Sequence, residues 1–207
     1  MLVVTKAATS RALLSLAELQ AAAGTSATSD TAALTALGLQ ISDTISTLCG
    51  VISDGVAIPT LLSEEMTETV RFTYPVKRVV LARRFVTSIK SVVVNGQVVS
   101  SSLYEVDNPT GVLRHLSTDG TTFIDWPVGK TVVQYVAGFA SAPDGLKLAA
   151  SQLVRQVWLV SQRDPSLKSE TFDGLGSFYY NDIGLLSKNE WSPAIRDMLG
   201  PYLSAGV

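Results

Sequence analysis

The N-terminal quarter of the chain contains two stretches with the apolar spacing of helices. The first, over residues 9–23, begins at two typical capping residues and ends before Gly24. The second, over residues 30–50, has apolar side chains three or four positions apart: Leu34, Leu37, Ile41, Ile45 and Leu48. This spacing places them on one face, so the pattern predicts two amphipathic helices joined by a short polar linker.

From Val56 the pattern changes to alternation and short apolar runs, which are typical of strands. Strands are predicted near residues 67–74, 79–81, 91–94, 98–100, 103–106, 112–116, 122–126 and 131–137. Asn95-Gly96 is a strong signal for a tight hairpin, and the turn-forming residues 107–111 indicate a second one. Residues 56–140 therefore predict a small antiparallel sheet or barrel.

Helical spacing returns after Pro143 and ends by Asp164-Pro165. The apolar positions are Leu146, Ala150, Leu153, Val157 and Val160. Residues 166–190 follow neither period and contain four aromatic residues among several glycines. A last helix is expected from Pro193, with Ile195, Met198, Leu199 and Tyr202 facing inward.

These elements predict an α+β protein built on a small α-helical bundle of about four helices. Residues 1–55 and 141–207 would form the helical core, and residues 56–140 would be an inserted antiparallel β module. Residues 166–190 would extend from the core as a C-terminal arm without regular structure.

The chain is poor in charge, which suggests contacts with other subunits. Charged residues make up 16% of its 207 positions, below the roughly 25% typical of soluble domains. One explanation is a surface partly covered by neighbouring subunits, and the other is a weakly charged monomer. The first 24 residues lack the continuous apolar run of a signal peptide or membrane span, so we expect a soluble protein made in the cytoplasm.

The residue types present give little support for an enzymatic function. His115 is the only histidine and Cys49 the only cysteine, so triads, histidine metal sites and internal disulfides lack their components. We expect His115 to be a strand residue that faces solvent or makes one hydrogen bond. Glu64, Glu65 and Glu68 form the densest acidic group, and we interpret them as a solvated face. The sequence predicts no enzyme and no cofactor, with an enzyme of unrecognised residues as a minor alternative.

Two groups of residues are candidates for partner binding. The first is apolar and aromatic and follows the β module: Phe172, Leu175, Phe178, Tyr179, Tyr180 and Tyr202. Aromatic side chains buried in a partner's pocket act as anchors, so an arm that crosses to a partner is one interpretation. The other is an arm folded back on its own helices.

The second group is basic and lies inside the predicted sheet: Lys77, Arg78, Arg83 and Arg84. These side chains could contact an acidic partner or phosphates, although a solvated sheet face is the common explanation. A net charge of −2 argues against a dedicated nucleic-acid binder, which needs clustered lysine and arginine.

The order of elements and several local strings resemble the head-to-tail connector, or adaptor, family of tailed bacteriophages. The strings lie mainly in the C-terminal half: Val132 to Phe139, Pro143, Leu146 to Ala150, Trp158, Arg163-Asp164-Pro165, Ser169-Glu170, Gly174 to Ser177, Tyr179-Tyr180 and Ile195 to Tyr202. The β module is larger than a purely helical adaptor carries, which distinguishes this chain from the simplest members.

The resemblance implies a structural virion protein in the neck, on the portal-tail axis. It would form a ring of twelve subunits beneath the portal protein, extend the DNA channel and provide the docking site for a stopper or tail-completion protein. Double-stranded DNA would pass through without sequence-specific binding, and no membrane would be involved. The alternative is a trimeric virion fibre whose β module binds a receptor or ligand.

Overall fold

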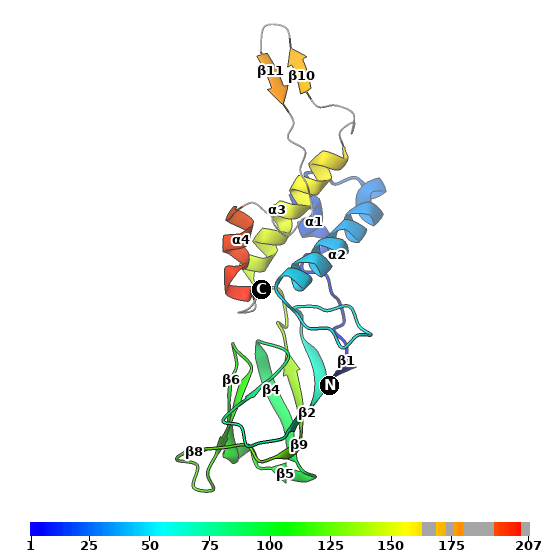
Figure 1. Ribbon diagram of the computed structural model, residues 1–207. Helices are drawn as coiled ribbons and strands as arrows, with labels where there is room; N and C mark the ends of the chain where they lie inside the picture. The colour runs from blue at the N-terminus through cyan, green and yellow to red at the C-terminus, as the bar shows by residue number, and fades with distance from the viewer. Residues whose placement is uncertain (163–168, 173–175, 180–192, 204–207) are drawn as a thin grey trace. The chain divides into compact units, whose positions relative to one another are not determined.

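The computed structural model describes residues 1–162, 169–172, 176–179 and 193–203. The chain forms two compact units (Figure 1). The β unit consists of Met1–Arg11 and Gly50–Ala142, and the helical unit of Ala12–Cys49 and Pro143–Val207. The predicted α+β class is confirmed, but residues 1–11 and 50–55 belong to the β unit and not to the helical core.

The β unit contains two antiparallel sheets. The larger sheet has the strand order β1-β2-β9-β4-β5, and the smaller has the order β3-β7-β6, with β8 also paired to β7. The strands are β1 (Leu2–Lys6), β2 (Glu64–Phe72), β3 (Val79–Val80), β4 (Val86–Val94), β5 (Gln97–Val99), β6 (Tyr104–Asp107), β7 (Val112–Leu116), β8 (Phe123–Ile124) and β9 (Gly129–Ala137).

Side chains from both sheets pack into one core. The buried members are Met66, Val79, Leu81, Val86, Val92, Val94, Leu113, Trp126, Val133, Tyr135 and Ala137. Alternation along β9 explains the arrangement, because its odd-numbered residues from 131 to 137 are buried and their neighbours are more exposed. The Trp126 indole is fully buried and donates a 3.3 Å hydrogen bond to the Leu113 carbonyl.

The first strand was not predicted from the sequence. β1 pairs antiparallel with β2 at the edge of the larger sheet, with Val3 opposite Thr67. β1 has five residues and pairs with a neighbour on one side, which is too short a stretch to show a clear apolar alternation. Leu2 to Thr5 are nevertheless mostly residue types that favour strands. The predicted Asn95-Gly96 hairpin is present, and both residues have positive φ (50° and 88°), as such a tight turn requires.

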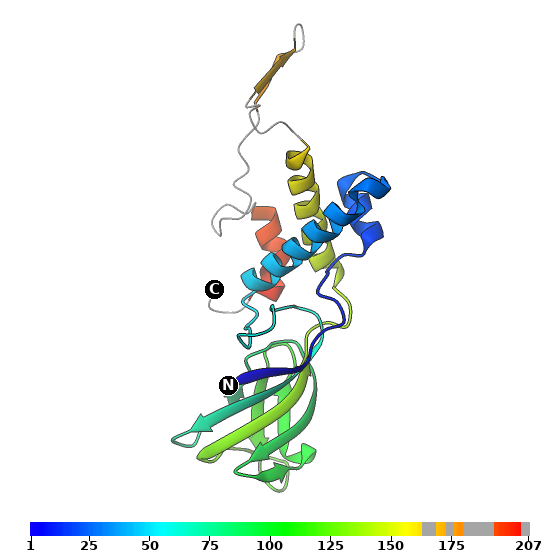
Figure 2. The same ribbon diagram turned by 90° about the vertical axis from the view of Figure 1, so that its right-hand side faces the viewer.

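Four helices are described in the helical unit, with α3 at their centre (Figure 2). They are α1 (Leu16–Ala23), α2 (Thr31–Leu48), α3 (Asp144–Ser161) and α4 (Pro193–Leu199), and α3 contacts each of the others. Buried side chains on these helices include Leu19, Leu34, Ile41, Ile45, Leu146, Ala149, Leu153, Val154, Ile195 and Leu199. The apolar stripes predicted for α2, α3 and α4 supply most of this core.

The first helix begins later than predicted. Ser15 is its N-cap, and its side chain and the Glu18 carboxylate satisfy each other's backbone N–H groups in a capping box. Leu13 and Leu14 precede the helix and are nevertheless buried. The Leu13 N–H donates to the Ser42 hydroxyl on α2 at 3.0 Å, so the approach to α1 is held by side chains and not by helical bonds.

Part of the segment predicted to lack regular structure is a hairpin. β10 (Ser169–Phe172) and β11 (Gly176–Tyr179) pair antiparallel, with Ser169 opposite Tyr179. Two four-residue strands are too short for periodicity to reveal them, although threonine, phenylalanine and tyrosine favour strands. The rest of residues 163–192 lies outside the described residues.

Candidate functional site

The described part of the chain offers no candidate metal site. These residues contain no cluster of three or more histidine, cysteine, aspartate or glutamate side chains that could hold a metal ion. His115 was expected to face solvent or make one hydrogen bond; its side chain is half-buried, and its ring stacks on the buried Trp126 at 4.6 Å between centroids. Among the described helices, none combines the length and the apolar composition needed to cross a bilayer.

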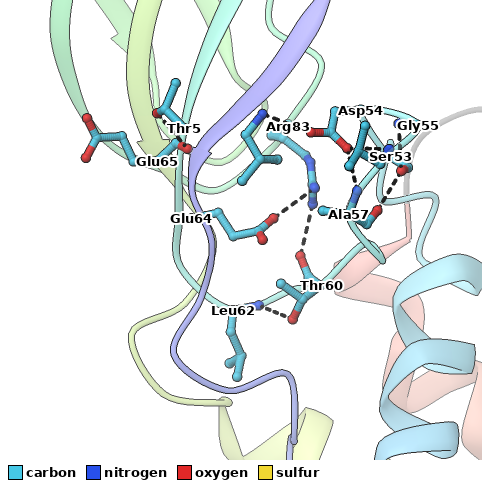
Figure 3. Close-up of polar contacts among 12 residues, drawn as sticks. Thr5, Ser53, Asp54, Gly55, Ala57, Thr60, Leu62, Glu64, Glu65 and Arg83 are labelled. Atoms are coloured by element: carbon cyan, nitrogen blue, oxygen red, sulfur yellow. Dashed lines mark hydrogen bonds and ion pairs between the residues drawn. The ribbon is translucent and has the colours of Figure 1, made fainter.

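A buried ion pair lies in the β unit (Figure 3). Arg83 Nη2 is 3.0 Å from Glu64 Oε2, and Arg83 Nη1 donates to the Thr60 carbonyl at 3.0 Å. Both side chains are at least nine-tenths buried. Burial raises the pKa of Glu64 even though Arg83 opposes this, and burial lowers the pKa of Arg83. Desolvation therefore outweighs the attraction between them.

A second buried carboxylate, Glu68, lies four residues further along the same strand. Glu68 Oε2 accepts a 3.0 Å hydrogen bond from the Tyr135 hydroxyl and a 2.8 Å bond from the Ala82 N–H. Burial and the neighbouring Glu68 raise the pKa of Tyr135, which keeps it a neutral donor. Glu64 and Glu68 are thus core-facing residues, and the predicted solvated acidic face is wrong for both.

The loop before β2 is held by one carboxylate (Figure 3). Asp54 Oδ1 accepts from the N–H groups of Val56 and Ala57 at 2.9 and 2.8 Å, and Asp54 Oδ2 accepts from Val4 on β1 at 3.1 Å. These bonds lower the pKa of Asp54. The Val56 side chain at the turn is 92% exposed, so the loop presents an apolar residue on an ordered backbone.

The predicted basic group is divided by the structure. Lys77 and Arg78 are exposed, and Arg84 is half-buried with its guanidinium 5.0 Å from the Phe85 ring centre. Arg83 is buried in its ion pair and cannot contact a surface partner, so its assignment to that group is wrong. Arg83 lies in an extended segment, where successive side chains point alternately to the core and to the surface. The sequence alone did not show which of the basic residues faces inward.

The predicted aromatic group is only partly described. Phe172, Phe178 and Tyr179 lie in the β10–β11 hairpin, whereas Leu175 and Tyr180 lie outside the described residues. Tyr202 follows α4 in a short 3₁₀ turn (Gly200–Tyr202) and is half-buried, with its hydroxyl 3.2 Å from where a Cβ on Gly145 would lie.

Exposed apolar side chains occur in both units. Those more than 40% exposed include Leu16, Ile52, Val56, Ile58, Tyr74, Val80, Val98, Phe123, Ile124, Val128, Leu148 and Leu159. Sequence reasoning did not select them, because exposure of a valine or leucine depends on which face its strand or helix buries. Side chains of this kind can bind another protein surface but offer no chemistry.

Comparisons with solved structures show where this fold recurs. A chain in "Neck of empty GTA particle computed with C6 symmetry" has 15% identity and a TM-score of 0.58, covering 100% of this chain and 97% of that one. A chain in "Neck of native GTA particle computed with C12 symmetry" has 13% identity, a TM-score of 0.57 and the same coverage. A chain in "Virion of native gene transfer agent (GTA) particle" has 17% identity and a TM-score of 0.52, covering 81% and 88%.

At these identities the likeness shows a shared fold. None of the curated proteins matches the chain. The family model described as head completion protein matches residues 12–204, which spans nearly the whole sequence and confirms the resemblance to phage head-to-tail connectors. The chain therefore belongs to the head completion protein family.

Proposed function

We propose that this protein is a subunit of a ring in the particle neck, between the head and the tail. The observation that carries the proposal is the family match over residues 12–204, together with a fold shared along the full chain with proteins from particle necks. The neck structures were computed with C6 and C12 symmetry, and a ring of twelve subunits is compatible with both. The family is a structural one and not an enzyme class.

Ring closure accounts for the surface of the subunit. A head-to-tail contact repeated around a closed ring leaves no unsatisfied interface at either end. The exposed apolar side chains and the low content of charge, 16%, suit such contacts. Contacts that are weak in one subunit become durable when many act together, because each later contact forms at high effective concentration.

We infer the partners of this chain from its proposed place in the neck, between the head and the tail. The ring would bind beneath the portal protein, extend the DNA channel and present a docking site for a stopper or tail-completion protein. Double-stranded DNA would pass without sequence-specific binding, which agrees with a net charge of −2.

The proposed anchors to the portal or a neighbouring subunit are the apolar and aromatic residues of the C-terminal region: Phe172, Leu175, Phe178, Tyr179, Tyr180 and Tyr202. Lys77, Arg78 and Arg84 are proposed contacts for an acidic partner or phosphates. Arg83 is excluded from this group because it is buried.

The subunit number is tested by native mass measurement of the purified chain alone and bound to isolated necks. A mass near twelve subunits supports the ring, and a mass near three supports a fibre.

The anchors are tested by replacing Phe178 and Tyr179 with alanine, which should weaken incorporation into necks at least tenfold, since an aromatic anchor contributes about 2 kcal/mol. Tyr74→Ala is the matched control, because Tyr74 is 69% exposed in the β unit and outside the proposed anchors.

A further inference from the structure

The chain passes between its two units three times, after Arg11, Cys49 and Ala142. On the side of the β unit, these passages run through residues 7–11, 50–63 and 138–142, which we call the first, second and third connections. They lead to β1, β2 and β9, which are adjacent strands of the larger sheet. Any displacement transmitted along the chain enters the β unit through these three segments.

The Arg83–Glu64 ion pair joins the first two connections. The Glu64 carboxylate accepts a hydrogen bond from the backbone N–H of Ala8 in the first connection. Arg83 Nη1 donates to the carbonyl of Thr60 in the second connection, and Nη2 bonds Glu64 itself (Figure 3). Arg83 comes from the segment between β3 and β4, so one buried residue of the β unit holds both connections.

The third connection is bonded to the second by backbone groups. The Phe139 N–H donates to the Leu61 carbonyl at 2.9 Å, and the Ser63 N–H donates to the Phe139 carbonyl at 2.9 Å. The Gly138 N–H donates to the Phe85 carbonyl at 3.0 Å, two residues from Arg83, and the Phe85 and Phe139 rings lie 4.7 Å apart. All three connections are therefore tied to the segment that carries Arg83.

We propose that Arg83 and Glu64 form a clasp that makes the three connections move as one body with the β unit. Without it, β1 would be the vulnerable element, because an edge strand pulled at its end loses its ladder bonds one after another. With the clasp, a pull on the first connection is shared by β2, β9 and the Arg83 segment. Desolvation opposes a buried ion pair, so the pair is an inefficient source of folding stability, but it fixes one arrangement of the connections.

The clasp would suit a neck protein that holds head and tail together, yet it is a property of a single chain and does not require the ring. Its test therefore uses the purified full-length chain. Replacing Arg83 alone leaves Glu64 buried and unpaired, which risks general unfolding. The informative variant is the double replacement Arg83→Met with Glu64→Met, which removes the polar bonds and keeps apolar volume in the core.

Hydrogen exchange followed residue by residue measures whether the opening is local. We expect the amides of Ala8, Ser63 and Phe139 to exchange about tenfold faster in the double variant, while Val92 and Val133 change less than about threefold. Equal acceleration at all five positions would show general destabilisation and overturn the proposal. So would unchanged exchange at the three connection amides.

Trypsin offers a second readout, because Lys6 directly precedes the first connection and Arg11 is its last residue. Cleavage after these residues should be about tenfold faster in the double variant, whereas cleavage after Lys77 and Arg78, which are exposed elsewhere in the β unit, should not change. Lys90→Met is the matched control, since it breaks the more exposed ion pair with Glu65, next to Glu64 on β2. If Lys90→Met accelerates cleavage as much as the double variant, the clasp is not specific to Arg83 and Glu64.

Discussion

Individual buried polar residues decide how the β unit is organised. Glu64, Met66 and Glu68 alternate inward along β2, so two carboxylates lie in the interior of the β unit beside a largely apolar core. Each finds a partner there, Arg83 for Glu64 and the Tyr135 hydroxyl for Glu68. A buried carboxylate without such partners would cost several kcal/mol, so these residues restrict the β unit to one packing.

Gly138, in the third connection, gives a testable prediction for the stability of the β unit. Gly138 has φ of +99°, and a Cβ there would lie 2.4 Å from the Leu62 carbonyl oxygen. Gly138→Ala should therefore destabilise the β unit by about 3 kcal/mol, from strain and backbone collision together. Gly120→Ala is the control, because Gly120 also has positive φ (+70°) but open space around it, and it should cost about 1 kcal/mol. Urea denaturation measures both, and equal effects would contradict the collision.

The ion pair in the helical unit predicts a pH dependence. Lys147 Nζ lies 2.8 Å from Glu18 Oε1, and this bond with the Ser15 cap lowers the pKa of Glu18 from 4.5 to about 2. Because the folded-state pKa is the lower one, the stabilisation is complete above about pH 4.5 and is lost as the pH falls toward 2. Glu18→Gln should be less stable than the natural chain at pH 6 and equal to it near pH 2. A difference that persists at pH 2 would show that charge is not its cause.

At the scale of elements, strong local signals and tertiary pairing contribute differently. The long stripe of α2 and the turn residues of the β4–β5 hairpin are sufficient to predict their elements, because the physical cause lies within a few residues. Short elements such as β1, β3 and β8 exist only through their partners. β3 and β8 lie within stretches 79–81 and 122–126 that the sequence predicted as strands, whereas the five residues of β1 show no local period.

The β4–β5 turn can be tested as an element. Asn95 has φ of +50°, its side chain donates to the Val128 carbonyl at 2.9 Å and accepts from the Lys130 N–H at 2.8 Å. Asn95→Ala should cost about 2 kcal/mol, because alanine loses both bonds and resists positive φ. Gln97→Ala, an exposed position of the same hairpin, should change stability by less than about 0.5 kcal/mol. Thermal unfolding compares them, and similar effects would show that the side chain of Asn95 is dispensable.

At the scale of the whole molecule, each of the two compact units has a described core of its own. The described core of the β unit draws on Val92, Trp126 and Val133, and that of the helical unit on Leu34, Ile45 and Leu146. Each core belongs to a unit built from two chain segments that are distant in sequence. Folding of the helical unit therefore requires closure of a long loop, residues 50–142, and joining of both segments of the β unit requires closure of the loop of residues 12–49.

Separate cores predict separable unfolding. Val133→Ala should lower only the transition of the β unit, and Ile45→Ala only that of the helical unit, each by about 3 kcal/mol for a fully buried side chain. Scanning calorimetry and hydrogen exchange of the monomeric chain distinguish the two transitions. A single transition that both substitutions shift equally would show that the units unfold together.

The sequence by itself determined the α+β class, the helical stripes and the main hairpins, because these depend on spacing and turn chemistry within short windows. It also supported the family through the order of elements. Tertiary structure decided the rest: that residues 1–11 belong to the β unit, that Glu64, Glu68 and Arg83 face inward, and that His115 stacks on Trp126. The physical reason is that the side a strand residue faces, and the partner it meets there, are set by register with segments far away in the chain.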